Sequence, residues 1–282
     1  MPSSRAHVVW TDRFFDYDFG PYHPFSERSR GLAAHLLESV TSASHPGVLG
    51  WSHTVEVASR PTLESFHQAD YLEFVKQASG ISREVSLDGG DTPAFRGCYD
   101  AAARIVQGAV DALDYTLEHR RPAFHPGGGL HHAHPDRASG FCIFNDVAIA
   151  VGRAVRSGHR VAYIDIDAHH GDGVMYGFYE SGKVLDIDFH QDGRTLFPGT
   201  GFPHEVGRGD APASKRTCRS RRARATRRCF RSSIASSPFC YAGSVRRSSS
   251  SSTGSTATTV TSSRIFSTLP PPTPRSTERS WR

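Results

Sequence analysis

The chain has 282 residues, of which 37% are hydrophobic, so it is long enough for one large domain or two small ones. Its net charge of +5 is the sum of two unlike parts. Residues 1–211 carry 18 Lys and Arg against 27 Asp and Glu, a net charge of −9, whereas residues 212–282 carry 15 and 1, a net charge of +14. The basic charge therefore describes only the second part, and the first part is not marked as a nucleic-acid-binding domain.

Cysteine spacing and hydropathy indicate in which cellular compartment the protein is expected. The five Cys residues show no paired C-x-x-C spacing, so a disulfide framework is not expected. No apolar stretch is long enough to span a bilayer, and the first residues lack the charged start and apolar core of a signal peptide. We therefore expect a cytoplasmic protein without membrane association. We make no prediction of the oligomeric state.

Hydrophobic periodicity predicts alternating strands and helices along residues 1–211. Leu32, Ala33, Leu36 and Leu37 lie on one face of the first predicted helix. In chain order we expect a strand at 8–10, helices at about 29–40, 67–77 and 91–117, a very short strand at 122–126, a helix at 145–156, and strands from 161 and at 184–189. This alternation predicts an α/β domain with a mostly parallel sheet flanked by helices. Active sites of such domains lie beyond the carboxyl ends of the strands.

Residues 212–282 have a different composition. They hold 18 Ser, 10 Thr and 14 Arg but one Lys, and they show no sustained hydrophobic period. Such a segment buries too little apolar surface to offset the entropy of ordering, so we predict a disordered tail. Spaced Arg and Ser could also bind RNA backbones, but the tail has few aromatic residues and no RGG repeats, so a solvated tail is the favoured interpretation.

The run V-A-Y-I-D-I-D-A-H-H-G-D-G, at 161–173, carries most of the chemical information. Alternate residues of a strand share a face, so Tyr163, Asp165, Asp167 and His169 are expected to project together. Two carboxylates and an imidazole at one strand end repel each other and lose solvation, and a bound cation relieves both effects. Asp and His together are usual ligands of zinc.

A second cluster, G-G-G-L-H-H-A, occupies 127–133. A glycine-rich turn can direct both His131 and His132 into one cavity. A pair of histidines suits proton transfer, because each ring can be tuned by a different partner. Asp165 and Asp172 are the natural partners, since a carboxylate that accepts the Nδ1–H of a histidine fixes its tautomer and raises its basicity.

At this point the sequence resembles the zinc-dependent histone deacetylase family, and within it the bacterial acetoin-utilisation-type members. The similarity lies in the runs at 127–146, 163–174 and 190–201, and in two N-terminal motifs at 17–24 and 63–72. The resemblance covers about residues 8–210. It implies an arginase/deacetylase-type α/β fold and the hydrolysis of an acetylated amine, such as an acetyl-lysine side chain or a small acetylated amine.

The resemblance also implies roles for individual residues. Asp167 and His169 would be two of three zinc ligands. His131 and His132 would be the general base and acid, supported by Asp165 and Asp172 respectively.

Two further groups of residues take their roles from the same resemblance. Asp165, together with backbone carbonyls near Asp188 and Phe189, would form a structural site for a monovalent cation. Phe141 and Phe197 would form the walls of a narrow apolar channel for the acylated side chain.

The chain departs from the family after residue 210. A catalytic zinc needs three protein ligands, and the family supplies the third Asp, and a Tyr that stabilises the oxyanion, from later segments. Beyond Asp210 the chain has Glu278 as its one acid, no His, and Tyr241 without a glycine-rich loop. We therefore predict an incomplete zinc site and impaired activity. A manganese ureohydrolase from the same fold group, suggested by Asp-Ala-His at 167–169, is the less favoured alternative.

The unusual tail suggests that residues 212–282 are translated out of frame. An Arg-, Ser-, Thr- and Pro-rich composition is what a GC-rich gene encodes in a wrong frame. Thr-Cys-Arg-Ser-Arg at 217–221 can be encoded by codons that, shifted by one nucleotide, read Val-Pro-Leu-Pro, which is similar to the family's next strand. We expect the gene around codon 212 to show a deacetylase-like continuation in another frame. An intact single frame without one would refute this hypothesis.

Overall fold

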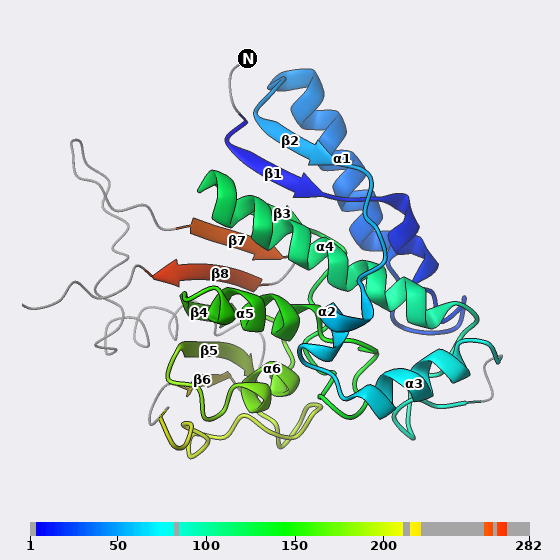
Figure 1. The fold of residues 1–282 in the computed structure, drawn as a ribbon, viewed down its shortest axis with the longest axis vertical. Coiled ribbons are helices and arrows are strands. Elements are labelled where there is room, and N and C mark those ends of the chain that lie inside the picture. Colours follow the sequence, from blue (N-terminus) through cyan, green and yellow to red (C-terminus); the bar gives the residue numbers. More distant parts are fainter. Residues whose placement is uncertain (1–3, 82–84, 211–214, 221–256, 262–263, 270–282) are drawn as a thin grey trace, which may run out of the picture.

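The structure is a computed structural model, and it describes residues 4–81, 85–210, 215–220, 257–261 and 264–269 (Figure 1). Within these residues, eight strands form one sheet in the order β2-β1-β3-β7-β8-β4-β5-β6. The strands are β1 (Ala6–Val9), β2 (Leu49–Ser52), β3 (Ala123–His125), β4 (Arg160–Asp165), β5 (Val184–Gln191), β6 (Lys215–Ser220), β7 (Ala257–Thr261) and β8 (Arg264–Leu269). Strand β8 runs antiparallel to both of its neighbours, and all other neighbouring strands are parallel. The predicted mostly parallel α/β sheet is confirmed.

Helices alternate with strands along the chain, as the hydrophobic periodicity predicts. They are the 3-10 helix η1 (Asp12–Asp16) and the α-helices α1 (Arg28–Ser44), α2 (Arg60–Glu64), α3 (Ala69–Ala78), α4 (Cys98–His119), α5 (Asp146–Arg156) and α6 (Asp172–Gly177). Helices α4 and α5 pack against each other across one face of the sheet, where α4 contacts β1, β3 and β7, and α5 contacts β4 (Figure 1).

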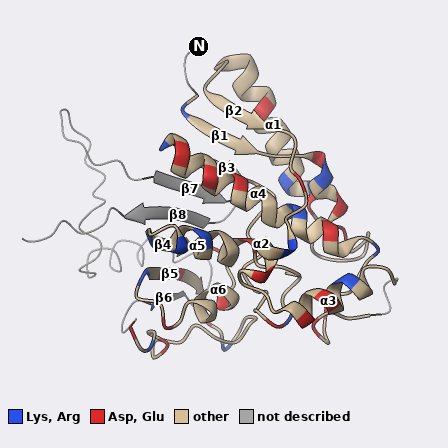
Figure 2. Cartoon of the chain, in the orientation of Figure 1, with Lys and Arg blue, Asp and Glu red and all other residues tan. Residues whose placement is uncertain are grey.

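The hydrophobic periodicity predicts that this helix begins at about residue 91, but α4 begins at Cys98. Its N-cap, Gly97, has a left-handed φ of 83°, which interrupts any helix running into it from the N-terminal side. Acidic residues recur along α4 (Figure 2). Among them, Asp114 forms a two-bond ion pair with Arg153 of α5. No helix in the described part of the chain is long and apolar enough to cross a membrane.

The apolar face predicted for the first helix is largely exposed, and of its residues Leu37 packs partly buried against the core. Leu32 and Leu36 of α1 are 71% and 62% exposed, and Val40 is 51% exposed. The fully buried residues of the helix are Gly31 and Ala34, which lie outside the predicted face. A Cβ at Gly31 would overlap the ring of Phe15, so the small residue allows the close approach. Periodicity alone did not identify the buried face, because α1 carries apolar residues on both sides.

Part of the predicted disordered tail forms strands. Strand β6 pairs in parallel with β5, and β7 and β8 fill the space between β3 and β4. These three strands, at 215–220, 257–261 and 264–269, lie within the segment predicted to be a disordered tail. A sheet edge presents unpaired N–H and C=O groups, which even a short segment can pair through its backbone. Strands β7 and β8 also contain the β-branched residues that are common in strands, whereas β6 has only one. The rest of 212–282 lies outside the described residues.

Close packing between α4 and the sheet yields the first prediction. A Cβ at Gly108 would lie 2.5 Å from the ring of buried His125 and 2.9 Å from Phe14. Gly108→Ala should therefore lower the free energy of unfolding by about 1–3 kcal/mol, despite the better helix propensity of Ala. Gly80→Ala is the matched control, because its Cβ would meet only one backbone oxygen, at 3.5 Å. Urea denaturation of both variants measures the difference, and equal stabilities would contradict the packing described here.

Candidate functional site

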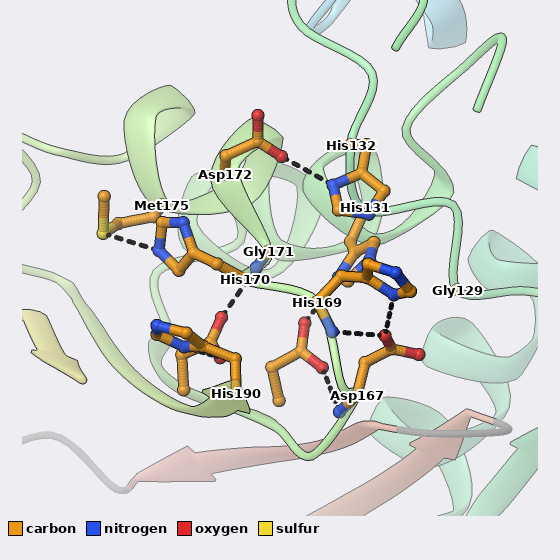
Figure 3. Close-up of polar contacts among 12 residues, drawn as sticks. Gly129, His131, His132, Asp167, His169, His170, Gly171, Asp172, Met175 and His190 are labelled. Carbon is orange, nitrogen blue, oxygen red and sulfur yellow. Dashed lines mark hydrogen bonds and ion pairs between the residues drawn. The ribbon is translucent and has the colours of Figure 1, made fainter. Parts of the chain in front are cut away.

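The candidate site lies beyond the carboxyl ends of β3 and β4, as expected for such a sheet. Strand β3 leads through Gly127–Gly129 to the twin histidines, and β4 ends at Asp165. The chain then turns through residues 166–171 into α6, whose first residue is Asp172. Figure 3 shows both segments converging, with the imidazoles between the carboxylates.

Each of the twin histidines meets its predicted carboxylate. His131 Nδ1 lies 2.7 Å from Asp165 Oδ2, and His132 Nδ1 lies 2.7 Å from Asp172 Oδ1. All four side chains are buried, and the two imidazole centroids are 3.9 Å apart. Burial alone would raise the pKa of Asp172, but hydrogen bonds from His132 and from His134 outweigh it and hold that pKa well below its usual range. Asp172 is therefore an ionised acceptor.

The loop that carries the histidines is held by two residues at the start of α5. The Asp146 carboxylate accepts hydrogen bonds from the backbone N–H of Gly129, at 2.9 Å, and of Leu130, at 2.6 Å. The Asn145 side chain caps α5 by accepting from Ala148 N, and its Nδ2 donates to the carbonyls of His131 and Ala133. Asn145 and Asp146 are fully buried, so these bonds fix the loop in a site without competing water.

The two predicted zinc ligands lie next to the histidines and are partly exposed. His169 Nδ1 is 3.0 Å from Asp167 Oδ1, and the two side chains are 42% and 31% exposed. The hydrogen bond with Asp167 raises the pKa of His169, against the opposing effect of burial. The Asp167 N–H in turn donates to Asp165 Oδ1 at 3.0 Å, which links the ligand pair to the acid–base pair.

These groups open into one cavity of about 350 Å³. Its lining includes His131, His132, Asp167, His169 and the two predicted channel walls, Phe141 and Phe197. Phe197 lies edge-on to His132, with centroids 5.0 Å apart. The structure therefore brings the predicted catalytic, metal-binding and channel residues to one place.

Phe141 is held in a backbone conformation that side chains rarely adopt. Its φ is 67°, and its N–H donates to Thr92 Oγ1 at 3.0 Å. The buried Tyr17 hydroxyl donates to Phe141 O at 2.6 Å and accepts from Ile143 N at 3.0 Å. Strained residues of this kind persist only when their surroundings fix them, and they cluster at ligand sites. Tyr17 and Thr92 thus set the position of Phe141, the predicted channel wall.

The donor set offers two groups of the right chemistry for zinc, one carboxylate and one imidazole. Among the residues with described coordinates, no third His, Cys, Asp or Glu joins Asp167 and His169 to form a metal-binding group. His190 and Asp188 are not available substitutes, because both are buried and bonded to each other at 2.7 Å, while His190 Nε2 contacts Gly201 O at 3.1 Å. The described residues therefore do not complete the three-ligand set of a catalytic zinc.

The residues predicted to hold a structural cation lie close together. Asp165 and Asp188 are directly opposite each other in the β4–β5 pairing, and Phe189 follows Asp188 on β5. Asp188 Oδ2 accepts from Gly171 N at 2.7 Å. All three residues are buried. The cation itself stays a prediction.

Sequence reasoning missed four residues that support the site. Asn145 and Asp146 lie within the run that carries the family resemblance, and an Asn before an apolar periodic run is also a helix N-cap signal. Tyr163 donates its hydroxyl to Asp165 Oδ2 and was placed correctly on that face of β4 without a role. His134 contacts Asp172, a relation between distant segments that no local pattern indicates.

The fold and the site together define an α/β domain with buried histidine–carboxylate pairs beyond the ends of its strands, and comparisons with known proteins specify the family. A model of the histone deacetylase domain matches residues 23–234. The acetoin utilization protein AcuC of Bacillus subtilis is 36% identical over 209 residues, which cover 71% of this chain and 53% of that protein. AcuC of Staphylococcus xylosus is 37% identical with the same coverage. The crystal structure of a histone deacetylase homologue from Aquifex aeolicus has a TM-score of 0.65 and 26% identity, and covers 77% of this chain and 59% of that one.

The chain belongs to the histone deacetylase family and is related to the AcuC proteins. It spans about half the length of the curated relatives that it matches. The matched range ends at residue 234, beyond the composition change near residue 212.

Burial of His67 beside the site yields the second prediction. His67 Nε2 accepts from Asn145 N at 3.0 Å, and burial lowers its pKa to about 4. An unfolded chain binds this proton near pH 6.5, so the folded state loses stability as pH falls from about 6.5 to about 4. His67→Gln keeps an acceptor without titrating, and should flatten the dependence by up to about 1.4 kcal/mol per pH unit.

The control for this prediction is His45→Gln, since His45 is exposed at the end of α1. Urea denaturation at several pH values between 4 and 7 measures the slopes. Identical slopes for the two variants would show that His67 is not buried in its neutral form.

Proposed function

We propose that this chain carries the acid–base half and the substrate channel of a deacetylase that removes acetyl groups from acetyl-lysine-like or small acetylated amines. The observation that supports this most is the pair of buried histidine–carboxylate units beside a cavity with aromatic walls. The proposal also draws on the relation to AcuC proteins, whose full length this chain does not reach.

We propose complementary roles for the two imidazoles, and their hydrogen bonds support this proposal. An ionised carboxylate only accepts, so Asp165 and Asp172 each take the Nδ1–H of their histidine. A neutral ring in this state keeps its lone pair on Nε2, which can accept a proton from an attacking water. The neighbouring ring, once protonated, can deliver a proton from its Nε2 to the departing amine. Phe141 and Phe197 would exclude water from the aliphatic part of the substrate.

The metal half of the site limits the activity that we propose. The family is in general zinc-dependent. Asp167 and His169 would contact one side of such an ion, and the described residues supply no third ligand. We therefore propose that the chain as given binds zinc weakly and turns over slowly. The proposed change of reading frame near residue 212 accounts for the missing ligand and for the missing oxyanion Tyr.

Zinc titration and turnover test this proposal. We expect the chain to bind zinc with a dissociation constant of about 1 μM or weaker, and Asp167→Asn to weaken it further. An acetyl-lysine peptide and an acetylated diamine serve as substrates. The matched control is a chain from a gene with its frame restored at codon 212, which should bind one zinc tightly and turn over at least about 100-fold faster.

Two outcomes would contradict the proposal. Tight, stoichiometric zinc binding and rapid deacetylation by the unaltered chain would show that the metal site is complete. Absence of deacetylation in the frame-restored chain, with one zinc bound, would show that the acid–base pair serves another reaction.

A further inference from the structure

His134 is a buried histidine that the acid–base pair itself does not use. It lies two residues after His132 and is 8% exposed. Its Nε2 is 3.1 Å from Asp172 Oδ2, while His132 Nδ1 is 2.7 Å from Asp172 Oδ1. One carboxylate thus receives both rings, one on each oxygen.

The protonation of this three-residue unit follows from the acceptor. Asp172 is ionised, with its pKa held low, and can only accept. His132 must therefore donate from Nδ1, and His134 must donate from Nε2. The two rings are consequently in opposite tautomers when both are neutral, although they are two residues apart.

A second donor matters because Asp172 is buried. With His132 as sole partner, Oδ2 would lose solvation without compensation, and the carboxylate could rotate away from its partner. The neighbouring unit has the same design, since Asp165 accepts from Tyr163 and from Asp167 N in addition to His131. In each unit the carboxylate is fixed by donors other than the histidine that faces the cavity.

Other groups around the unit do not replace His134. The ring of Tyr176 is stacked at 6.3 Å from the His134 ring, and its hydroxyl is bonded to Glu205. His132 itself is faced by the rings of His131 and His169. Among the bonds that the structure describes, Oδ2 of Asp172 takes its side-chain donor from His134.

We propose that His134 is a positioning residue, which fixes the Asp172 carboxylate and thereby holds His132 in the tautomer whose Nε2 faces the cavity. The effect of His134 on catalysis rests on the proposed function, whereas its effect on the tautomer of His132 does not. His134 acts through Asp172 and contacts no substrate.

Imidazole nitrogen spectra test the role directly. Long-range 1H–15N correlation of the full chain at pH 8, where an ordinary histidine is neutral, distinguishes the two tautomers. Signals are assigned with His132→Gln and His134→Gln. In the unaltered chain we expect His132 as the Nδ1–H form and His134 as the Nε2–H form.

Two substitutions at one position separate donation from packing. His134→Phe keeps a ring against Tyr176 but removes the donor, and should leave His132 as a mixture of tautomers. His134→Gln keeps an N–H donor and should restore the single form of His132. His45→Phe, at an exposed site, is the control and should leave the His132 signals unchanged. In the frame-restored chain, kcat should fall about 10-fold for His134→Phe and less than about 3-fold for His134→Gln, with KM little changed.

Specific results would overturn the inference. If His134 of the unaltered chain is in the Nδ1–H form, its Nε2 does not donate to Asp172. This result is obtained without any variant, so it does not depend on whether a variant folds. A folded His134→Phe chain with His132 entirely in the Nδ1–H form would show that Asp172 is held without His134. The expected tautomers together with an absence of deacetylation would instead leave the positioning role intact and remove the proposed reaction.

Discussion

The burial of two carboxylates, Asp165 at the end of β4 and Asp172 at the start of α6, is the constraint on which the site depends. Their exposed fractions are 0% and 5%, so neither can rely on water for solvation. The histidines that contact both carboxylates come from a separate loop, which must approach closely. Glycine permits this approach, since a Cβ at Gly171 would lie 2.6 Å from Asp165 Oδ2 and 3.1 Å from His131 Nδ1. The histidines are therefore held in place by the same interactions that make burial of the acids tolerable.

Two elements fix the position of the histidine loop, strand β3 and the first turn of helix α5. The loop follows directly from the carboxyl end of strand β3. Asn145 and Asp146, at the start of α5, form hydrogen bonds with the backbone of the loop. Helix α5 also packs on β4, which carries Asp165. One helix thus connects the backbone of the acid–base loop to the strand that supplies its partner carboxylate.

The strands in the middle of the sheet determine how far apart the two halves of the site lie. Strands β3 and β4 carry the two halves of the site, yet β7 and β8 lie between them. Because neighbouring strands are about 4.8 Å apart, these two strands set the distance across which the loops must meet. Residues 257–261 and 264–269 therefore bear on the site through their place in the sheet. The two predicted zinc ligands, Asp167 and His169, both come from the loop after β4.

Local patterns in the sequence were sufficient for the alternation of strands and helices, for the mostly parallel sheet, and for the grouping of His131, His132, Asp165 and Asp172. These features are encoded by periods of 2 and 3.6 residues and by short motifs, which are properties of neighbouring residues. The buried side of α1, the strands formed after residue 212 and the contact of His134 with Asp172 were not predictable in this way. Each depends on which surface or hydrogen-bonding group a distant segment leaves without a partner, and only the packed chain decides that.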